Sequence, residues 1–103
     1  MKNRSLSDDW LLKRGDEVLG FLQYEDTDQA FFYFQFHPEP AFASICELFE
    51  EELRLLNEDR LDEWERSYDR IETLDLTLVS TVDGSELHEF LLHIDGNCAW
   101  FRA

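Results

Sequence analysis

The sequence predicts an α+β fold in which two helices cover one face of an antiparallel sheet. Strand-like runs rich in aromatic residues occupy the first and last thirds of the 103 residues, and amphipathic helical patterns occupy the middle. Because strands and helices are kept apart along the chain, a parallel βαβ arrangement is disfavoured. We expect six strands in the order β-β-β-α-α-β-β-β, within a single domain over 1–103 whose residues 1–8 form a flexible N-terminal arm.

Three strands are predicted within residues 10–37. A tight turn at 15–16 closes the first hairpin, and the polar loop 25–29 closes the second. Pro38 and Pro40 end the third strand, because proline has no N–H to donate to a sheet. The turn lengths predict these cross-strand pairs: Leu22 with Phe32, Gly20 with Phe34, and Val18 with Phe36.

Two amphipathic helices are predicted over 41–56 and 61–71. In each, the large apolar residues recur at steps of three and four, which places them on one stripe of a helix. The acidic run Glu50-Glu51-Glu52 is expected to face solvent. The stripes consist of Phe42, Ile45, Phe49, Leu53 and Leu56, and of Leu61, Trp64, Tyr68 and Ile71.

The last third is predicted to be a three-stranded meander. Strands at 74–79, 87–94 and 98–102 are separated by turns at 83–85 and 95–96. Glu89 is then expected to lie opposite Arg102 as an ion pair. The expected apolar pairs are Leu78 with Phe90, Leu76 with Leu92, Leu74 with Ile94, Leu92 with Ala99, and Phe90 with Phe101.

Both faces of the predicted sheet are apolar, although two helices cover only one. The face expected beneath the helices contains Leu74, Leu76, Leu78, Phe90, Leu92, Phe32, Phe34 and Phe36. The opposite face is predicted to be an association surface, unless the sheet curls and makes that face internal. Its interface candidates are Trp10, Leu12, Phe21, Phe31, Tyr33, Leu91 and Trp100.

Residues capable of chemistry are too scattered to predict an active site. His88 and His93 are five residues apart on one strand and so point to opposite faces. We therefore expect no metal, no cofactor and no catalytic residue. The least unsuitable enzymatic candidates are His37, His93 and Glu89, whereas a chemical role for Cys98 is left open and Cys46 is expected to be a packing residue.

The formal net charge of −15 limits the partners of this chain. Anionic membranes and nucleic acids are disfavoured, since they repel such a surface. We expect a cytoplasmic, non-enzymatic protein-interaction domain that binds a protein partner, a basic one in particular, or a second copy of itself as a homodimer. One alternative is an immunity- or antitoxin-like inhibitor of a basic protein, and another is a small enzyme with a histidine–carboxylate site.

Three segments, FHPEPAF, LFEEELRLLNEDRLDEWERSYDRI and FLLHIDGNCAWFR, resemble a family of small acidic bacterial proteins of no known activity. The resemblance covers about residues 10–102. It implies a shared structural framework, but no ligand, cofactor or activity. The implied framework residues are Phe36, Pro38, Pro40, Phe42, Trp64, Tyr68, Asp95, Gly96, Trp100 and Phe101.

Overall fold

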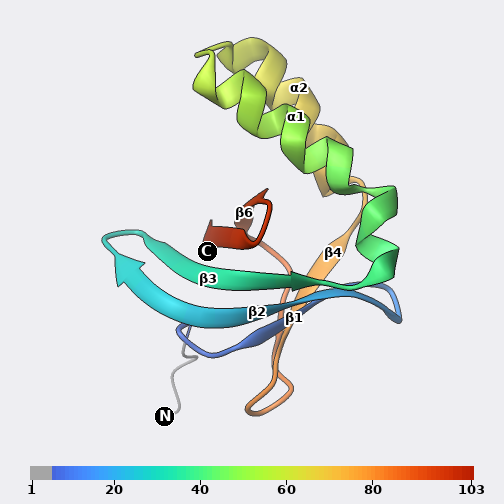
Figure 1. Ribbon diagram of the computed structural model, residues 1–103, viewed down its shortest axis with the longest axis vertical. Coiled ribbons are helices and arrows are strands. Elements are labelled where there is room, and N and C mark those ends of the chain that lie inside the picture. Colours follow the sequence, from blue (N-terminus) through green and yellow to red (C-terminus); the bar gives the residue numbers. More distant parts are fainter. Residues whose placement is uncertain (1–5) are drawn as a thin grey trace.

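The computed structural model describes residues 6–103 and has the predicted α+β class (Figure 1). The sheet has seven strands rather than the six predicted, because the expected strand 87–94 is divided into two. The strands are β1 (Trp10–Arg14), β2 (Glu17–Asp28), β3 (Phe31–Pro38), β4 (Leu76–Ser80), β5 (Glu86–Leu87), β6 (Leu91–Asp95) and β7 (Cys98–Arg102). The helical segment consists of η1 (Pro40–Ser44), α1 (Cys46–Asn57) and α2 (Leu61–Glu72).

The predicted C-terminal meander is wrong, because its strands lie at opposite edges of the sheet. The strand order is β5-β4-β1-β2-β3-β7-β6, with every neighbouring pair antiparallel. β4 pairs with β1 and with the short β5, so Leu78 lies opposite Leu87 rather than Phe90. The chain then crosses through residues 88–90 to the other edge, where β7 pairs with β3.

Two hairpin registers also differ from those expected. The β2–β3 turn is only Gln29–Ala30, with Gln29 at a φ of 52°, so Leu22 lies opposite Phe36 rather than Phe32. The β6–β7 turn is Gly96–Asn97, which places Leu92 opposite Phe101. The β2–β3 register was predicted wrongly because the polar residues 25–28 continue the strand beyond its apolar part. The β6–β7 turn has the predicted length of two residues but begins one residue later, which shifts the register.

The first hairpin contains a β-bulge that reverses the predicted faces of β1. Its register shifts between Leu12 and Lys13, and as a result Trp10 lies opposite Leu22. A one-residue shift moves a side chain to the other face of a sheet. Trp10 and Leu12 are therefore fully buried in the core, and their assignment to the association surface is wrong.

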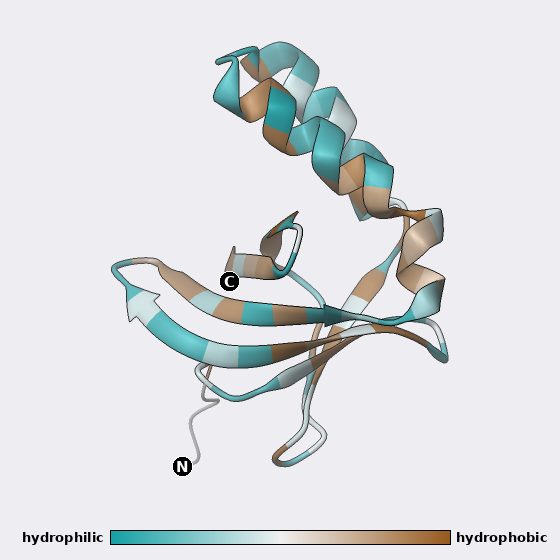
Figure 2. Ribbon diagram, viewed as in Figure 1, coloured by the Kyte–Doolittle hydropathy of each residue, from teal (hydrophilic) through white to brown (hydrophobic). Residues whose placement is uncertain are grey.

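The sheet curls around its inner face. The rings of Trp10 on β1 and Phe101 on β7 are 6.1 Å apart, although β2 and β3 lie between those strands. In a flat sheet three strand spacings would separate them by about 14 Å. Hydrophobic and hydrophilic residues alternate from Phe34 to His37 in the later part of β3, as a strand with one buried face requires (Figure 2). The predicted core residues Leu76, Leu78, Leu92, Phe34 and Phe36 are all buried, whereas Phe32, Leu74 and Phe90 are half-buried at its margin.

The helices do not lie across the sheet as predicted. α1 and α2 form a hairpin that stands on β6 at the sheet edge (Figure 1). The curled sheet buries most of its inner face against itself. The part that η1 and α1 cover is mainly the open end of this curled sheet. The Phe42 ring provides this cover, at 4.9 Å from Phe36 and 5.9 Å from Phe49.

The predicted N-terminal arm lies partly outside the described residues, which begin at Leu6. Leu6 packs against the core, and its carbonyl accepts a hydrogen bond from Trp10 Nε1 at 3.3 Å. The Asp8 carboxylate accepts a hydrogen bond from the Ser80 hydroxyl at 3.1 Å. Residues 6–8 are thus attached to the sheet.

Candidate functional site

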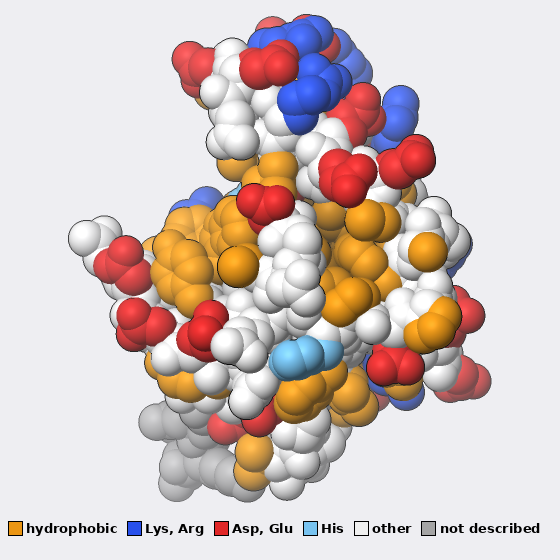
Figure 3. Space-filling model, viewed as in Figure 1, with side chains coloured by type: hydrophobic (Ala, Val, Ile, Leu, Met, Phe, Trp, Pro, Cys, Tyr) orange, Lys and Arg blue, Asp and Glu red, His pale blue; other side chains and the backbone are white. Residues whose placement is uncertain are grey.

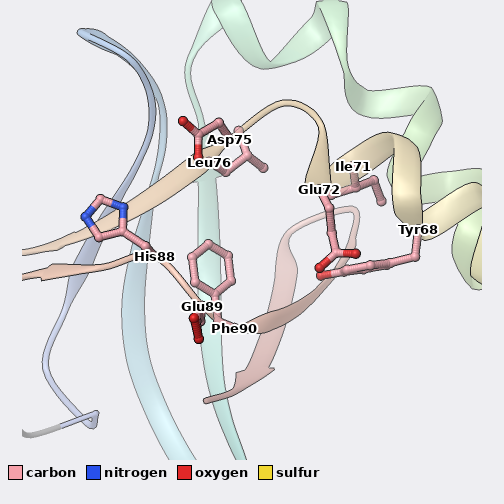
Figure 4. A pocket seen from close by; sticks show the side chains of 8 residues that line it. All are labelled: Tyr68, Ile71, Glu72, Asp75, Leu76, His88, Glu89 and Phe90. Atoms are coloured by element: carbon pink, nitrogen blue, oxygen red, sulfur yellow. The ribbon is translucent and has the colours of Figure 1, made fainter.

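The side of α2 that faces the 88–90 crossover forms an acidic pocket of about 280 Å³ (Figure 4). In Figure 4 the Phe90 ring stands between His88 on one side and Glu72 with Tyr68 on the other. The remaining lining residues are Ile71, Asp75, Leu76 and Glu89. The pocket thus combines apolar walls with three exposed carboxylates.

A second hollow continues this pocket along α2. It has a volume of about 380 Å³ and shares Tyr68, Glu72 and Phe90 with the first. The new lining residues are Trp64, Glu65, Asp69, Leu91 and Arg102. We call the two together the α2 groove. It contains five exposed carboxylates, those of Glu65, Asp69, Glu72, Asp75 and Glu89.

The floor of the groove is fixed by Tyr68, which attaches α2 to the free edge of β6. The Tyr68 hydroxyl accepts a hydrogen bond from the Leu92 N–H at 2.7 Å and donates one to the Leu92 carbonyl at 3.2 Å. An edge strand otherwise leaves such groups unpaired. Burial raises the pKa of Tyr68, the hydrogen bond with Leu92 lowers it, and the carboxylates of Glu52 and Glu72 raise it further. Tyr68 therefore remains a neutral hydroxyl at physiological pH.

A buried histidine–carboxylate pair lies beneath this surface. His93 Nδ1 is 2.8 Å from Glu52 Oε2 and 3.1 Å from Oε1, and the Trp64 indole N–H donates to Oε1 at 2.7 Å. Glu52 is 0% and His93 3% exposed. This three-residue cluster connects α1, α2 and β6. It holds the helical hairpin on the sheet, and its burial keeps His93 from contact with a substrate.

The sequence interpretation missed Glu52, which it placed on the solvent-facing side of α1. The buried positions of α1 are Phe49, Glu52 and Leu55, at steps of three. Glu52 therefore lies on the same helical face as Phe49, and this spacing was the available signal. A glutamate at the centre of an apolar stripe indicates a buried partner, which here is His93.

The other interface candidates lie on the outer face of the sheet. Phe21, Phe31, Tyr33, Leu91 and Trp100 are all half-buried, and we call these five residues the outer aromatic patch. The Tyr33 and Trp100 rings stack at 6.4 Å, and Trp100 in turn lies 5.5 Å from the His93 ring. From the side shown in Figure 3, hydrophobic side chains gather over the strands, while charged ones predominate over the helices.

The outer aromatic patch adjoins the α2 groove. Leu91 belongs to both, and Arg102, which lines the groove, lies over the Phe31 ring at 5.7 Å from its centroid. Leu91 is the strand partner of Arg102, so Glu89 does not lie opposite that residue as predicted. The two surfaces thus meet at Leu91 on β6 and Arg102 on β7.

The structure does not bring the enzymatic candidates together. His37 hydrogen-bonds Gln23 at 3.1 Å on the outer face, whereas His93 pairs with Glu52 and Glu89 lines the groove. No group of three or more His, Cys, Asp or Glu side chains in residues 6–103 is arranged to hold a metal ion.

The two cysteines are free thiols. Cys46 is half-buried and donates a hydrogen bond to Glu50 at 3.6 Å. Burial and the neighbouring Glu50 raise its pKa. A raised pKa disfavours the thiolate, so Cys46 is a poor nucleophile. Cys98 is exposed on β7.

No protein-family model, curated protein or solved structure matches the chain. The resemblance to small acidic bacterial proteins therefore stays a prediction. Among residues 6–103, no helix is both long enough and apolar enough to cross a membrane.

Proposed function

We propose that this protein is a non-enzymatic protein-binding domain whose α2 groove receives a basic segment of a partner protein. The observation that carries the proposal is the groove lining, in which five exposed carboxylates surround apolar side chains and face one arginine, Arg102. A chain with a net charge of −15 attracts cationic surfaces from a distance. The groove would then select among them by shape.

Lysine and arginine side chains match this lining in two ways. Their methylene stems pack on apolar surface while the charged group stays in a polar environment. Phe90 and Leu91 offer the apolar contact, and Glu72 and Asp69 offer the charge. The half-buried Trp64 adds an aromatic ring, which attracts cations through its face.

The outer aromatic patch extends the proposed binding surface to the sheet. We favour a basic partner over a second copy of this chain, because two molecules each carrying −15 repel one another. Sedimentation of the protein alone distinguishes a basic partner from a second copy of this chain. A monomer at micromolar concentration agrees with the proposal, whereas a dimer that dissociates on Trp100→Asp would identify the patch as a homodimer interface.

The groove is tested by its binding to a synthetic peptide of alternating lysine and leucine. The double substitution Glu72→Gln with Glu89→Gln should weaken binding about tenfold, because two charge pairs are lost. The matched control is Asp16→Asn with Asp28→Asn, which removes the same charge from exposed positions on the turn before β2 and at its end. Equal weakening in both proteins would mean that net charge, and not the groove, binds the peptide.

A further inference from the structure

The opposite side of the helical hairpin has a different character. A groove of about 170 Å³ between α1 and α2 contains three of the nine Lys and Arg residues in this acidic chain. On the face of the molecule shown in Figure 3, the largest group of basic side chains lies over the helices, at the end away from the sheet. The lining residues are Glu51, Arg54, Leu55, Glu63, Arg66, Ser67 and Arg70.

Ser67 in this groove is a buried polar group without a partner. It is 4% exposed, and its hydroxyl makes no hydrogen bond with any of residues 6–103. Buried hydroxyls in native proteins are nearly always hydrogen-bonded, so an unpaired one calls for an explanation. A ligand that accepts a hydrogen bond in the groove would satisfy it.

The arginines around Ser67 retain free donors. Arg54 and Arg70 contact Glu51 at 3.6 Å and 3.5 Å, near the outer limit of an ion pair, and Arg54 also contacts Glu58 at 3.4 Å. Within the described part of the chain, Arg66 takes part in no ion pair. Each guanidinium has five N–H donors in a planar fork that fits the oxygens of a phosphate or carboxylate.

The two carboxylates of the groove leave room for an anion. Glu63 already accepts hydrogen bonds from Arg60 Nε and Nη2, so its charge is compensated outside the groove. Glu51 is 41% exposed and is held only by the long contacts to Arg54 and Arg70. An incoming oxyanion can therefore replace Glu51 between these arginines.

We propose that the outer groove between α1 and α2 binds a phosphate group, which Arg66, Arg70 and Arg54 hold by charge and Ser67 holds through its hydroxyl. This site is independent of the α2 groove. Its volume of about 170 Å³ is several times that of one water molecule, which takes about 30 Å³. A single phosphate group thus fits, whether as inorganic phosphate or as a phosphate monoester.

The test is a titration of the full chain with inorganic phosphate and, separately, with free phosphoserine, followed by NMR at residues 66–70. Saturable shifts with both anions support a general phosphate site, and shifts with phosphoserine alone support a monoester site. Arg66→Gln should weaken binding about tenfold, because one charged donor is lost. The matched control, Arg14→Gln, removes an exposed arginine on β1 and should bind as the unmodified protein does.

Ser67→Ala provides a second readout. It should weaken phosphate binding while leaving the unfolding midpoint of the free protein unchanged or higher, because it removes an unpaired buried hydroxyl. The proposal is overturned if neither anion gives a saturable shift. It is also overturned if Arg66→Gln binds as tightly as Arg14→Gln does.

Discussion

At the scale of single residues, the Glu52 carboxylate connects both helices to the sheet. It accepts hydrogen bonds from both His93 and Trp64 while being fully buried. Glu52→Ala should lower the free energy of unfolding by about 3–5 kcal/mol, because it leaves the imidazole and indole donors unpaired in the interior. Chemical denaturation monitored by circular dichroism measures this loss.

Glu51→Ala is the matched control for Glu52. The two residues are neighbours on α1, but Glu51 is 41% exposed and makes only long ion pairs with Arg54 and Arg70. Its removal should change the free energy of unfolding by less than about 1 kcal/mol. Similar losses for both substitutions would contradict a special role of the buried carboxylate.

We predict that the protein loses stability at alkaline pH because Tyr68 is buried as a neutral phenol. Its pKa in the folded protein is raised by burial, whereas in the unfolded chain a tyrosine ionises near pH 10. The contribution of Tyr68 to the free energy of unfolding is fully present below pH 10 and is lost as the pH rises above it. The loss is up to about 1.4 kcal/mol per pH unit, because only the unfolded chain releases the phenol proton. Denaturation at several pH values above 9 measures the slope.

Tyr68→Phe is the control for this alkaline slope. The variant has no phenol to ionise, so its stability should fall less steeply above pH 10. It also loses the hydrogen bonds to Leu92, which lowers its stability at every pH. Parallel slopes in the two proteins would assign the alkaline effect to other groups.

At the scale of elements, the stability of the helical hairpin depends on how α1 seals the curled sheet. Phe49 is 1% exposed and contacts the Phe42 ring, which in turn lies on Phe36. Phe49→Ala should lower the free energy of unfolding by about 3–5 kcal/mol, since it leaves a cavity where the ring was. The 51%-exposed Leu61 of α2 is the comparison, and Leu61→Ala should stay within about 0.5 kcal/mol.

A loss below about 1 kcal/mol for Phe49→Ala would place this ring at the rim of the core rather than inside it. The sequence predicted correctly that Phe49 is buried, but not which part of the sheet it contacts. It placed Phe49 against one face of the sheet, whereas the residue helps to close the open end of a curled sheet. The burial of Phe49 follows from helical periodicity, but its partner follows from the curvature of the sheet.

At the scale of the whole molecule, the net charge of −15 predicts that salt stabilises the fold. Like charges repel more strongly in the compact state than in the extended chain, and salt screens this repulsion. The denaturant midpoint should therefore rise between low salt and about 0.5 M NaCl. Glu65→Lys with Asp69→Lys reduces the net negative charge on α2, so that protein should show a smaller rise. An unchanged or lower midpoint in the unmodified protein would refute this prediction.

Several features were determined by the sequence alone. Strand and helix patterns produced the α+β class, because the periods of two and 3.6 residues are local properties of the chain. The burial of Phe34, Phe36, Leu78 and Leu92 followed from the same alternation. The acidity that underlies the proposed basic partner is likewise a matter of composition.

Only the tertiary structure decided the strand order, the curl and the position of the candidate site. A bulge at Leu12–Lys13 moved Trp10 into the core, and no local pattern marks that one-residue shift. Pairing of β7 with β3 brought His93 beneath Glu52, 41 residues away along the chain. Such contacts depend on which distant strands meet, and this choice reflects the packing of the whole core rather than the preferences of any single segment.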